Sequence, residues 1–256
     1  MSDNFIWYEL MTTDVAAARK FYSAVVGWEM SEGGQPGMPY TIVSAGTRGV
    51  GGIAALSTEA GDAGTPPAWM GYIGVDDTDA TARRVADAGG RVLRAPDDIP
   101  QVGRFAVVAD PGGAAFMLLA PLPRDDVPQA PEQGTPGTIG WHELYAGNGQ
   151  QAAFAFYSAL FGWTTVDEMD MGAMGKYRTF AIDGTSRGGM MDKPTEMPVA
   201  SWGYYFNVDG LDAAMTRITV NRGKVLMGPH EVPGGSWIVQ ATDPQGAHFA
   251  LVSLRR

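Results

Sequence analysis

Cysteine is absent from this chain of 256 residues. Without thiols the protein has no disulfide bridges, thiolate metal sites or cysteine nucleophiles. Histidine is also scarce, with three residues, so chemistry that requires several imidazole groups has few candidates. These two scarcities leave carboxylates, hydroxyls and aromatic rings as the main carriers of chemistry.

Basic residues are also fewer than acidic ones. The chain has 18 lysines and arginines against 28 aspartates and glutamates, a net charge of −10. Nucleic acids and anionic membranes attract basic surfaces, so we expect neither as a partner. No apolar run approaches the roughly 20 residues of a membrane helix, and residues 1–7 show no signal-peptide pattern. We therefore expect a cytoplasmic protein, although export without a leader leaves no mark on a sequence.

What the sequence does contain is an internal repeat. The same motifs follow one another in the same order in both halves, at a nearly constant separation, and chance does not produce such a series. The matched pairs are Trp-x-Glu-Leu at 7–10 and 141–144, Phe-Tyr-Ser-Ala at 21–24 and 156–159, Gly-Gly at 51–52 and 188–189, and Asp-Pro-x-Gly at 110–113 and 243–246. We therefore predict two tandem modules.

The boundary between the modules falls in a proline-rich stretch. Prolines prevent regular helix and sheet and favour an extended spacer. We predict a first module over residues 1–121, a linker over 122–137 and a second module over 138–256. The linker permits the modules to pair within one chain, which we favour, but pairing across chains in a homodimer stays open.

Strand and helix periods alternate within each module. Residues 5–11 form a short aromatic and β-branched strand, after which Asp14 offers a helix N-cap and apolar residues recur at helical spacing up to Gly27. Gly27 and its counterpart Gly162 suit left-handed C-terminal caps. Each module is thus predicted to contain the element order β-α-β-β-β twice, which is typical of an α+β protein.

That element order, with strand, Asp-x6-Phe-Tyr, Gly and a closing Asp-Pro-x-Gly, resembles the glyoxalase/bleomycin-resistance/extradiol-dioxygenase superfamily, also called vicinal oxygen chelate proteins. The resemblance covers residues 5–121 and 138–254, and it implies sheets curled into half-barrels. The Trp-x-Glu-Leu openings are most similar to a two-module actinobacterial branch labelled as hydroxylases or secreted antigens. The superfamily's activities imply either a lyase or isomerase or an oxidoreductase if the chain is an enzyme.

Metal-dependent members of this superfamily carry a His or Glu on the first strand, a His on the fifth and a Glu on the eighth. The matching positions of the first module hold Trp7, Met70 and Met117. An indole N–H is only a donor and a thioether is a soft ligand, so neither suits a divalent cation in this chemistry. We expect no metal cofactor in the first module.

The second module leads to the same expectation. Its matching positions hold Trp141, Gly203 and Ala250, which offer no ligand. Counting instead from the Phe-Tyr pair places His142 at the first-strand position. The repeated Trp-x-Glu-Leu favours Trp141, and strand alternation then turns His142 to the helix-covered face.

The remaining polar candidates lie close to the matched tryptophans. Glu9 and Glu143 follow Trp7 and Trp141 by two residues, so alternation directs both carboxylates into the pocket, where either could act as a general base. An equally good reading is a salt bridge or hydrogen bond inside a module interface. The residues expected to line the pocket are Trp7, Met70, Tyr72, Met117, Trp141, Tyr205, His230 and His248.

Three functions remain open. The first, which we favour, is a metal-independent small-molecule-binding protein whose aromatic and apolar pocket carries Glu9 or Glu143. The second is a metal-dependent lyase, isomerase or dioxygenase, which the missing ligands disfavour. The third is a non-catalytic interaction protein whose pockets are filled by their own side chains.

Overall fold

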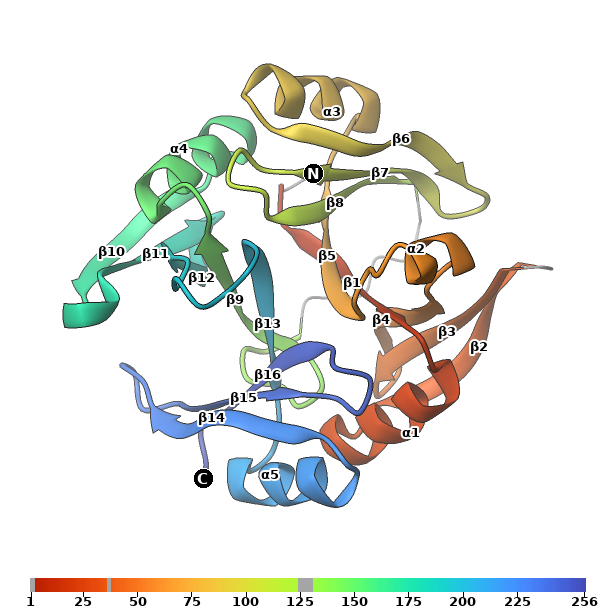
Figure 1. Cartoon of the computed structure of the whole chain (residues 1–256), viewed down its shortest axis with the longest axis vertical. Coiled ribbons are helices and arrows are strands. Elements are labelled where there is room, and N and C mark those ends of the chain that lie inside the picture. The colour runs from red at the N-terminus through yellow and green to blue at the C-terminus, as the bar shows by residue number, and fades with distance from the viewer. Residues whose placement is uncertain (1–2, 36–37, 124–130) are drawn as a thin grey trace. The chain divides into compact units, whose positions relative to one another are not determined.

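A computed structural model of the chain describes residues 3–35, 38–123 and 131–256. Residues 124–130 of the expected linker lie outside this description. Each module forms one mixed eight-stranded sheet, in the order β2-β3-β4-β1-β5-β8-β7-β6 for the first and β10-β11-β12-β9-β13-β16-β15-β14 for the second (Figure 1). The predicted α+β class and the doubled β-α-β-β-β order are confirmed.

The repeat in the sequence becomes a repeat in the elements. The strands of the first module are β1 (Phe5–Thr12), β2 (Glu29–Gln35), β3 (Met38–Ala45), β4 (Arg48–Ala55), β5 (Ala68–Gly74), β6 (Arg91–Ile99), β7 (Gly103–Ala109) and β8 (Ala115–Pro121). Those of the second are β9 (Ile139–Ala146), β10 (Thr164–Asp170), β11 (Lys176–Ile182), β12 (Thr185–Asp192), β13 (Ser201–Asn207), β14 (Lys224–Glu231), β15 (Trp237–Thr242) and β16 (His248–Ser253).

Helices connect some of the strands, and the two that precede Gly27 and Gly162 end at these glycines, as expected. They are α1 (Val15–Val26), α2 (Thr58–Asp62), α3 (Thr78–Asp87), α4 (Gln150–Phe161), α5 (Leu211–Val220) and a 3₁₀ turn, η1 (Gly172–Met174). The Asp14 carboxylate caps α1 by accepting from the Ala17 backbone N–H at 2.9 Å, and Gly27 ends it at φ 86°. The glycine is required there because a positive φ costs other residues a steric penalty. Among the described residues, no helix is long and apolar enough to cross a bilayer.

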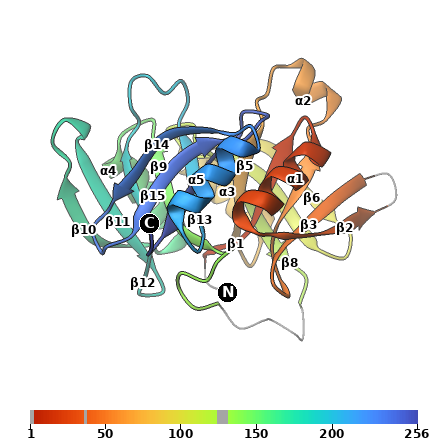
Figure 2. The same ribbon diagram turned by 90° about the horizontal axis from the view of Figure 1, so that it is seen from below.

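The chain folds into two compact units, and each unit takes one half from each module. Unit I consists of residues 1–6, 70–127 and 142–203, and unit II of residues 7–69, 128–141 and 204–256. Within unit II, α1 of the first module packs against α5 of the second (Figure 2). The modules therefore meet inside one chain.

Aromatic rings from both modules form the core of unit II. The ring of Trp28 lies 4.8 Å from that of Phe206, and Phe21 contacts Phe249 at 5.7 Å. Edge-on ring pairs at such distances contribute about 0.5–1.5 kcal/mol beyond their buried area. The core of unit I is built in the same way: Phe116 of the first module lies 5.5 Å from Tyr157 of the second, and Tyr157 stacks on Trp163 at 5.1 Å.

One buried hydrogen-bond network recurs in both units. In unit II the Trp69 Nε1–H donates to the Tyr22 hydroxyl at 2.8 Å, and this hydroxyl donates to Asp243 Oδ2 at 3.2 Å. In unit I the corresponding distances are 2.9 Å from Trp202 to Tyr157 and 3.2 Å from Tyr157 to Asp110. Each network fastens a helix of one module to the Asp-Pro-x-Gly turn belonging to the other.

Candidate functional site

Strand alternation on β1 places Trp7 and Glu9 together on one face of the sheet. The Trp7 Nε1–H donates to the Tyr40 hydroxyl at 2.9 Å, and this hydroxyl is hydrogen-bonded to Glu9, whose exposure is 9%. Burial, and next the negative charge of Glu9, raise the pKa of Tyr40 well above its usual value. The phenol therefore stays protonated at neutral pH and donates to the carboxylate.

The glycine pair on β4 makes room for this arrangement. A Cβ on Gly52 would collide with the ring of Tyr40, and one on Gly51 would collide with the backbone oxygen of Tyr8. On β12, Gly189 gives the same space to Tyr177. Both glycine pairs thus allow a close approach, by tyrosine rings as well as by the backbone of a neighbouring strand.

We expect Gly52→Ala to lower the free energy of unfolding by about 1–3 kcal/mol, because the new methyl displaces a packed ring. A second change, Tyr40→Ser, should remove most of this loss, and a double-mutant cycle measured by urea denaturation reports the coupling. Gly61→Ala is the control, since a Cβ there meets nothing within 4 Å. Equal losses from Gly52→Ala with and without Tyr40 would contradict the packing explanation.

In unit I, Glu143 has a tyrosine partner of its own. Its Oε2 accepts a hydrogen bond of 2.6 Å from the hydroxyl of Tyr145, two residues along β9 on the same face. Glu143 is 8% exposed and Tyr145 is half-buried. A Cβ on neighbouring Gly203 would lie 3.8 Å from Tyr145 Cε2, which is ordinary van der Waals contact.

The other candidates of unit I come from the first module. Tyr72 on β5 and Met117 on β8 are partners in the parallel ladder, and their exposures are 4% and 2%. Met70 is half-buried and lies near the start of β5. The structure thus brings Tyr72 and Met117 together as a well-buried pair.

The second module supplies the remaining candidates of unit II. The Tyr205 hydroxyl accepts from Gln240 Nε2 at 2.9 Å, and Tyr205 lies opposite Ala250 in the parallel ladder. Trp141 is half-buried. His230 on β14 and His248 at the start of β16 are both exposed.

His142 lies among aromatic residues in unit I. Its ring stacks on Phe5 at 4.3 Å, and its Nδ1–H donates to the backbone oxygen of Arg187 at 2.8 Å. Burial lowers the pKa of His142 to about 4, so the imidazole is neutral at pH 7. An imidazole held by an aromatic stack and a backbone carbonyl is a structural group.

The metal that many members of the resembled superfamily carry does not fit these residues. At the first-strand position, Trp7 uses its only polar atom to donate to Tyr40. At the others, Met70, Met117, Gly203 and Ala250 supply no hard ligand. Among the described residues, no three His, Asp or Glu side chains gather in a group that could hold a metal ion.

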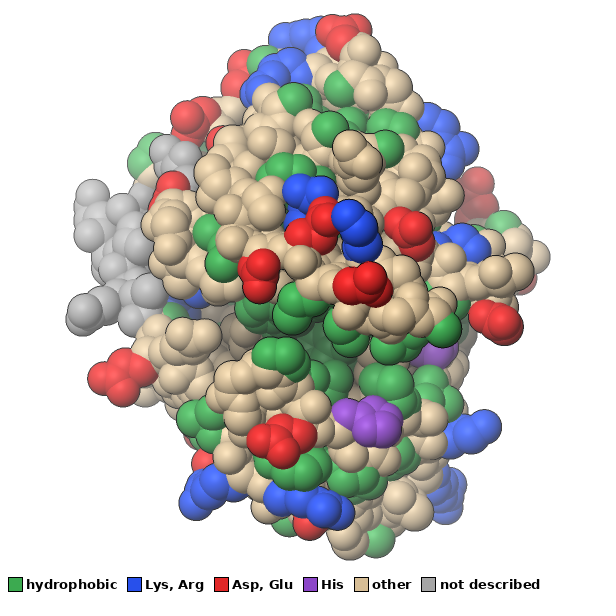
Figure 3. Space-filling view, turned by 90° about the vertical axis from the view of Figure 1, so that its left-hand side faces the viewer, with side chains coloured by type: hydrophobic (Ala, Val, Ile, Leu, Met, Phe, Trp, Pro, Cys, Tyr) green, Lys and Arg blue, Asp and Glu red, His purple; other side chains and the backbone are tan. Residues whose placement is uncertain are grey.

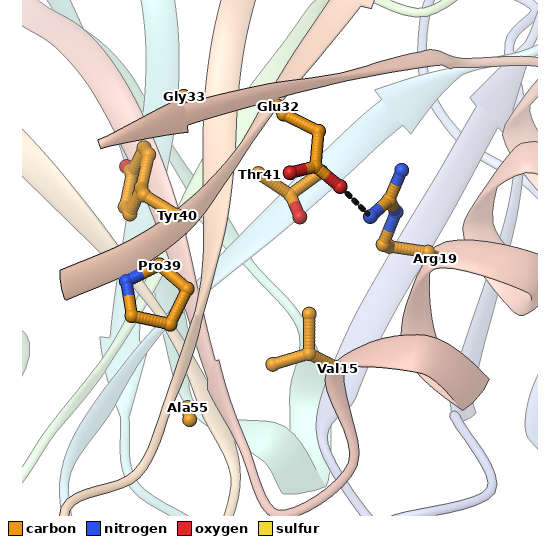
Figure 4. Close-up of a pocket in the computed structure, with 8 residues that line it drawn as sticks. All are labelled: Val15, Arg19, Glu32, Gly33, Pro39, Tyr40, Thr41 and Ala55. Atoms are coloured by element: carbon orange, nitrogen blue, oxygen red, sulfur yellow. Dashed lines mark hydrogen bonds and ion pairs between the residues drawn. The ribbon is translucent and has the colours of Figure 1, made fainter. Parts of the chain in front are cut away.

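A separate small cavity of about 160 Å³ lies in unit II between α1 and the β2–β3 hairpin (Figure 4). Arg19 points from α1 toward Glu32 on β2, and the two form an ion pair of 3.4 Å. Glu32 is almost fully exposed, so this pair is weak. Tyr40, which is hydrogen-bonded to Trp7 and Glu9, also lines this cavity.

Figure 3 shows how charged and hydrophobic side chains are distributed on one face of the molecule. Acidic and basic side chains are interspersed there in small groups, with hydrophobic side chains between them.

Solved structures with the same fold include a glyoxalase and a dioxygenase. A Mn(II)-bound glyoxalase from Novosphingobium aromaticivorans is 17% identical at a TM-score of 0.65, over 100% of this chain and 83% of that one. The 2,3-dioxygenase LapB from Pseudomonas sp. KL28 is 14% identical at a TM-score of 0.65, over 98% and 93% of the two chains. At these identities the similarity establishes the fold alone.

Curated relatives are closer in sequence. "Putative glyoxylase CFP32" of Mycobacterium tuberculosis is 33% identical over 96% of this chain and 93% of its own. The anthracycline biosynthesis protein DnrV of Streptomyces peucetius is 33% identical over 97% and 92%. Residues 4–118 and 139–251 both match the family described as Glyoxalase/Bleomycin resistance protein/Dioxygenase superfamily. The chain therefore belongs to this superfamily, as a member with two tandem modules.

Proposed function

We propose that this protein binds a small organic molecule through a buried carboxylate–phenol pair and has no resident metal ion. The observation that supports this most directly is the 2.6 Å hydrogen bond from Tyr145 to the buried Glu143. Glu9 with Tyr40 forms the second such pair. Both glutamates lie two residues beyond the position where metal-dependent members of the superfamily carry a ligand.

A carboxylate next to a phenol can perform the polar part of recognition without a cation. Its two oxygens offer about four acceptor positions, so it can accept from a tyrosine and from a ligand hydroxyl or amine at once. Hydrogen bonds to a charged acceptor are about twice as strong as neutral ones. The same carboxylate can take a proton from a bound ligand, with the neighbouring phenol as the donor that stabilises it.

The test combines elemental analysis of the purified protein with a thermal-shift screen. The panel contains catechols, hydroxyanthraquinones, an anthracycline, and adducts of 2-oxoaldehydes with thiols, the classes that the names of relatives and neighbours suggest. A ligand at 100 times its Kd should stabilise the fold by about 2.7 kcal/mol. Treatment with EDTA should leave that stabilisation unchanged.

Two outcomes would contradict the proposal. One is stoichiometric Mn, Fe, Ni or Zn in the purified protein, with ligand binding that is lost on chelation and restored by the metal. This result would show that ligand binding depends on a metal ion. No stabilisation by any panel member would remove the binding function. If binding is found, Glu9→Gln and Glu143→Gln should show which carboxylate contacts the ligand, because one of them should weaken it about tenfold or more.

A further inference from the structure

The turn between β10 and β11 carries methionines in a closely spaced series (Figure 1). Residues 169–174 read Met-Asp-Met-Gly-Ala-Met, so three of the chain's 14 methionines fall within this short segment. The matched hairpin of the first module, over residues 29–45, has only Met30 and Met38, which are well separated in the sequence. The series therefore belongs to the second module and is not part of the repeat.

Backbone hydrogen bonds hold two of these methionines close together. The Met174 N–H donates to the carbonyl oxygen of Met171 at 3.3 Å, and the Met171 N–H donates to that of Gly175 at 2.8 Å. A turn of four residues places its first and last Cα atoms within about 7 Å of each other. Methionine side chains have three rotatable bonds, so both sulfur atoms can reach a single ion.

The third methionine, Met169, lies next to Met171 at the end of β10. Only Asp170 separates them, so strand alternation directs both to the same side, with about 7 Å between their Cα atoms. Met169 is half-buried and is paired with Tyr177 on β11. Met171 is 39% exposed and Met174 is 57% exposed. An ion can therefore reach the thioethers from solvent.

A negative charge also lies at this turn. The Oδ1 atom of Asp170 accepts from the Gly172 backbone N–H at 2.8 Å, which holds the carboxylate at the start of the turn. Lys176, the ladder partner of Asp170, is paired instead with Glu168 at 2.6 Å. A carboxylate at this place attracts a cation to the neighbouring sulfur atoms.

The chemistry of thioethers determines which cation they bind. Thioether sulfur is a soft ligand that selects Cu(I), whereas Mg²⁺, Ca²⁺ and Mn²⁺ prefer carboxylate and carbonyl oxygens. Thiolates compete with thioethers for soft ions, but this chain has no cysteine. Of its three histidines, His142 is buried and bonded to the Arg187 carbonyl oxygen.

We infer that Met169, Met171 and Met174 form a surface site for one soft monovalent cation, Cu(I). Because its ligands are at the surface, the ion exchanges with solvent and is not a resident cofactor. β10 is the third strand from β9 in the sheet, about 14 Å away, so the site is separate from the pair of Tyr145 and Glu143. The inference is therefore independent of the proposed function.

Cu(I) binding is measured on the full chain without oxygen, by competition with the coloured chelator bicinchoninate. We expect one Cu(I) per chain. Met171→Leu and Met174→Leu should each weaken binding about tenfold or more, and the triple variant that also carries Met169→Leu should abolish it. Leucine keeps the volume and removes the sulfur. Met227→Leu is the control, because Met227 is 37% exposed, almost as much as Met171, and lies on β14.

Protection from oxidation locates the site without any substitution. Hydrogen peroxide transfers an oxygen atom to a thioether, which gives methionine sulfoxide and water. A bound ion occupies the sulfur lone pair that this reaction requires. Ag(I), a soft monovalent ion without the redox cycling of copper, should therefore slow oxidation of Met171 and Met174 several-fold. Peptide mass spectrometry should show an unchanged rate for Met227.

Three results would overturn the inference. The first is a parent chain that takes no Cu(I) from the chelator. The second is undiminished binding by the triple variant, with its fold verified by circular dichroism, because the ion would then bind elsewhere. The third is equal protection of Met227 and of the turn by Ag(I), because that ion would then bind thioethers without regard to their grouping.

Discussion

Asp243→Ala should lower the free energy of unfolding by about 3–5 kcal/mol, because it breaks a buried polar network. Asp243 is 3% exposed, and its Oδ1 accepts from the backbone N–H groups of Gln245 and Ala247, each at 2.9 Å. Its Oδ2 accepts from the Tyr22 hydroxyl at 3.2 Å. Alanine leaves three donors without this acceptor. Urea denaturation at pH 7 measures the loss.

Graded variants show whether the network is responsible. Tyr22→Phe removes one hydroxyl and should cost about 1–3 kcal/mol. Asp110→Ala, the matched change in unit I, should cost about as much as Asp243→Ala, since Asp110 accepts from Tyr157 and from the Ala114 backbone N–H. Asp209→Ala is the control, because Asp209 is highly exposed and its ion pair is long, at 3.7 Å. A loss below about 1 kcal/mol for Asp243→Ala would contradict the explanation.

Local patterns predict the doubled β-α-β-β-β order of this fold correctly, but they do not predict the contacts between distant elements. The N-cap Asp14 and the terminal Gly27 set the limits of α1 through contacts within four residues, so the sequence reveals them. The repeated Phe-Tyr and Asp-Pro motifs are equally visible. Tyr22 is hydrogen-bonded to Asp243, which lies 221 residues further along the chain in the other module. Only tertiary packing brings these two residues together.

In the candidate site, too, some residues follow from a local pattern and others only from tertiary packing. Alternation along one strand predicts that Trp7 and Glu9 share a face, and the same rule applied one step further would have found Tyr145 beside Glu143. Tyr40 reaches Glu9 from β3, a strand whose register with β1 no local pattern fixes. A weak signal existed, because Tyr40 and Tyr177 each precede the second glycine of a pair by 12 residues.

Acid should destabilise the protein through His142. Its pKa is about 4 when folded and buried, against 6.5 for the free side chain. Between those values the unfolded chain binds the proton and the folded chain does not, so stability is complete above pH 6.5 and is lost as the pH falls toward 4. The two pKa values imply a loss of about 2–3 kcal/mol between pH 7 and pH 4.5.

His142→Phe isolates this contribution. Phenylalanine keeps a ring to stack on Phe5 but has no proton to gain, and the lost hydrogen bond to the Arg187 carbonyl shifts stability by a similar amount at every pH at which His142 would be neutral. Burial raises the pKa of Asp110 and Asp243, which favours the folded state in acid, but both aspartates are present in both proteins. Urea denaturation at pH 7 and pH 4.5 should therefore show a smaller loss for His142→Phe, by about 2–3 kcal/mol. Equal losses would mean that His142 takes up its proton in the folded state, and that the imidazole is accessible to solvent.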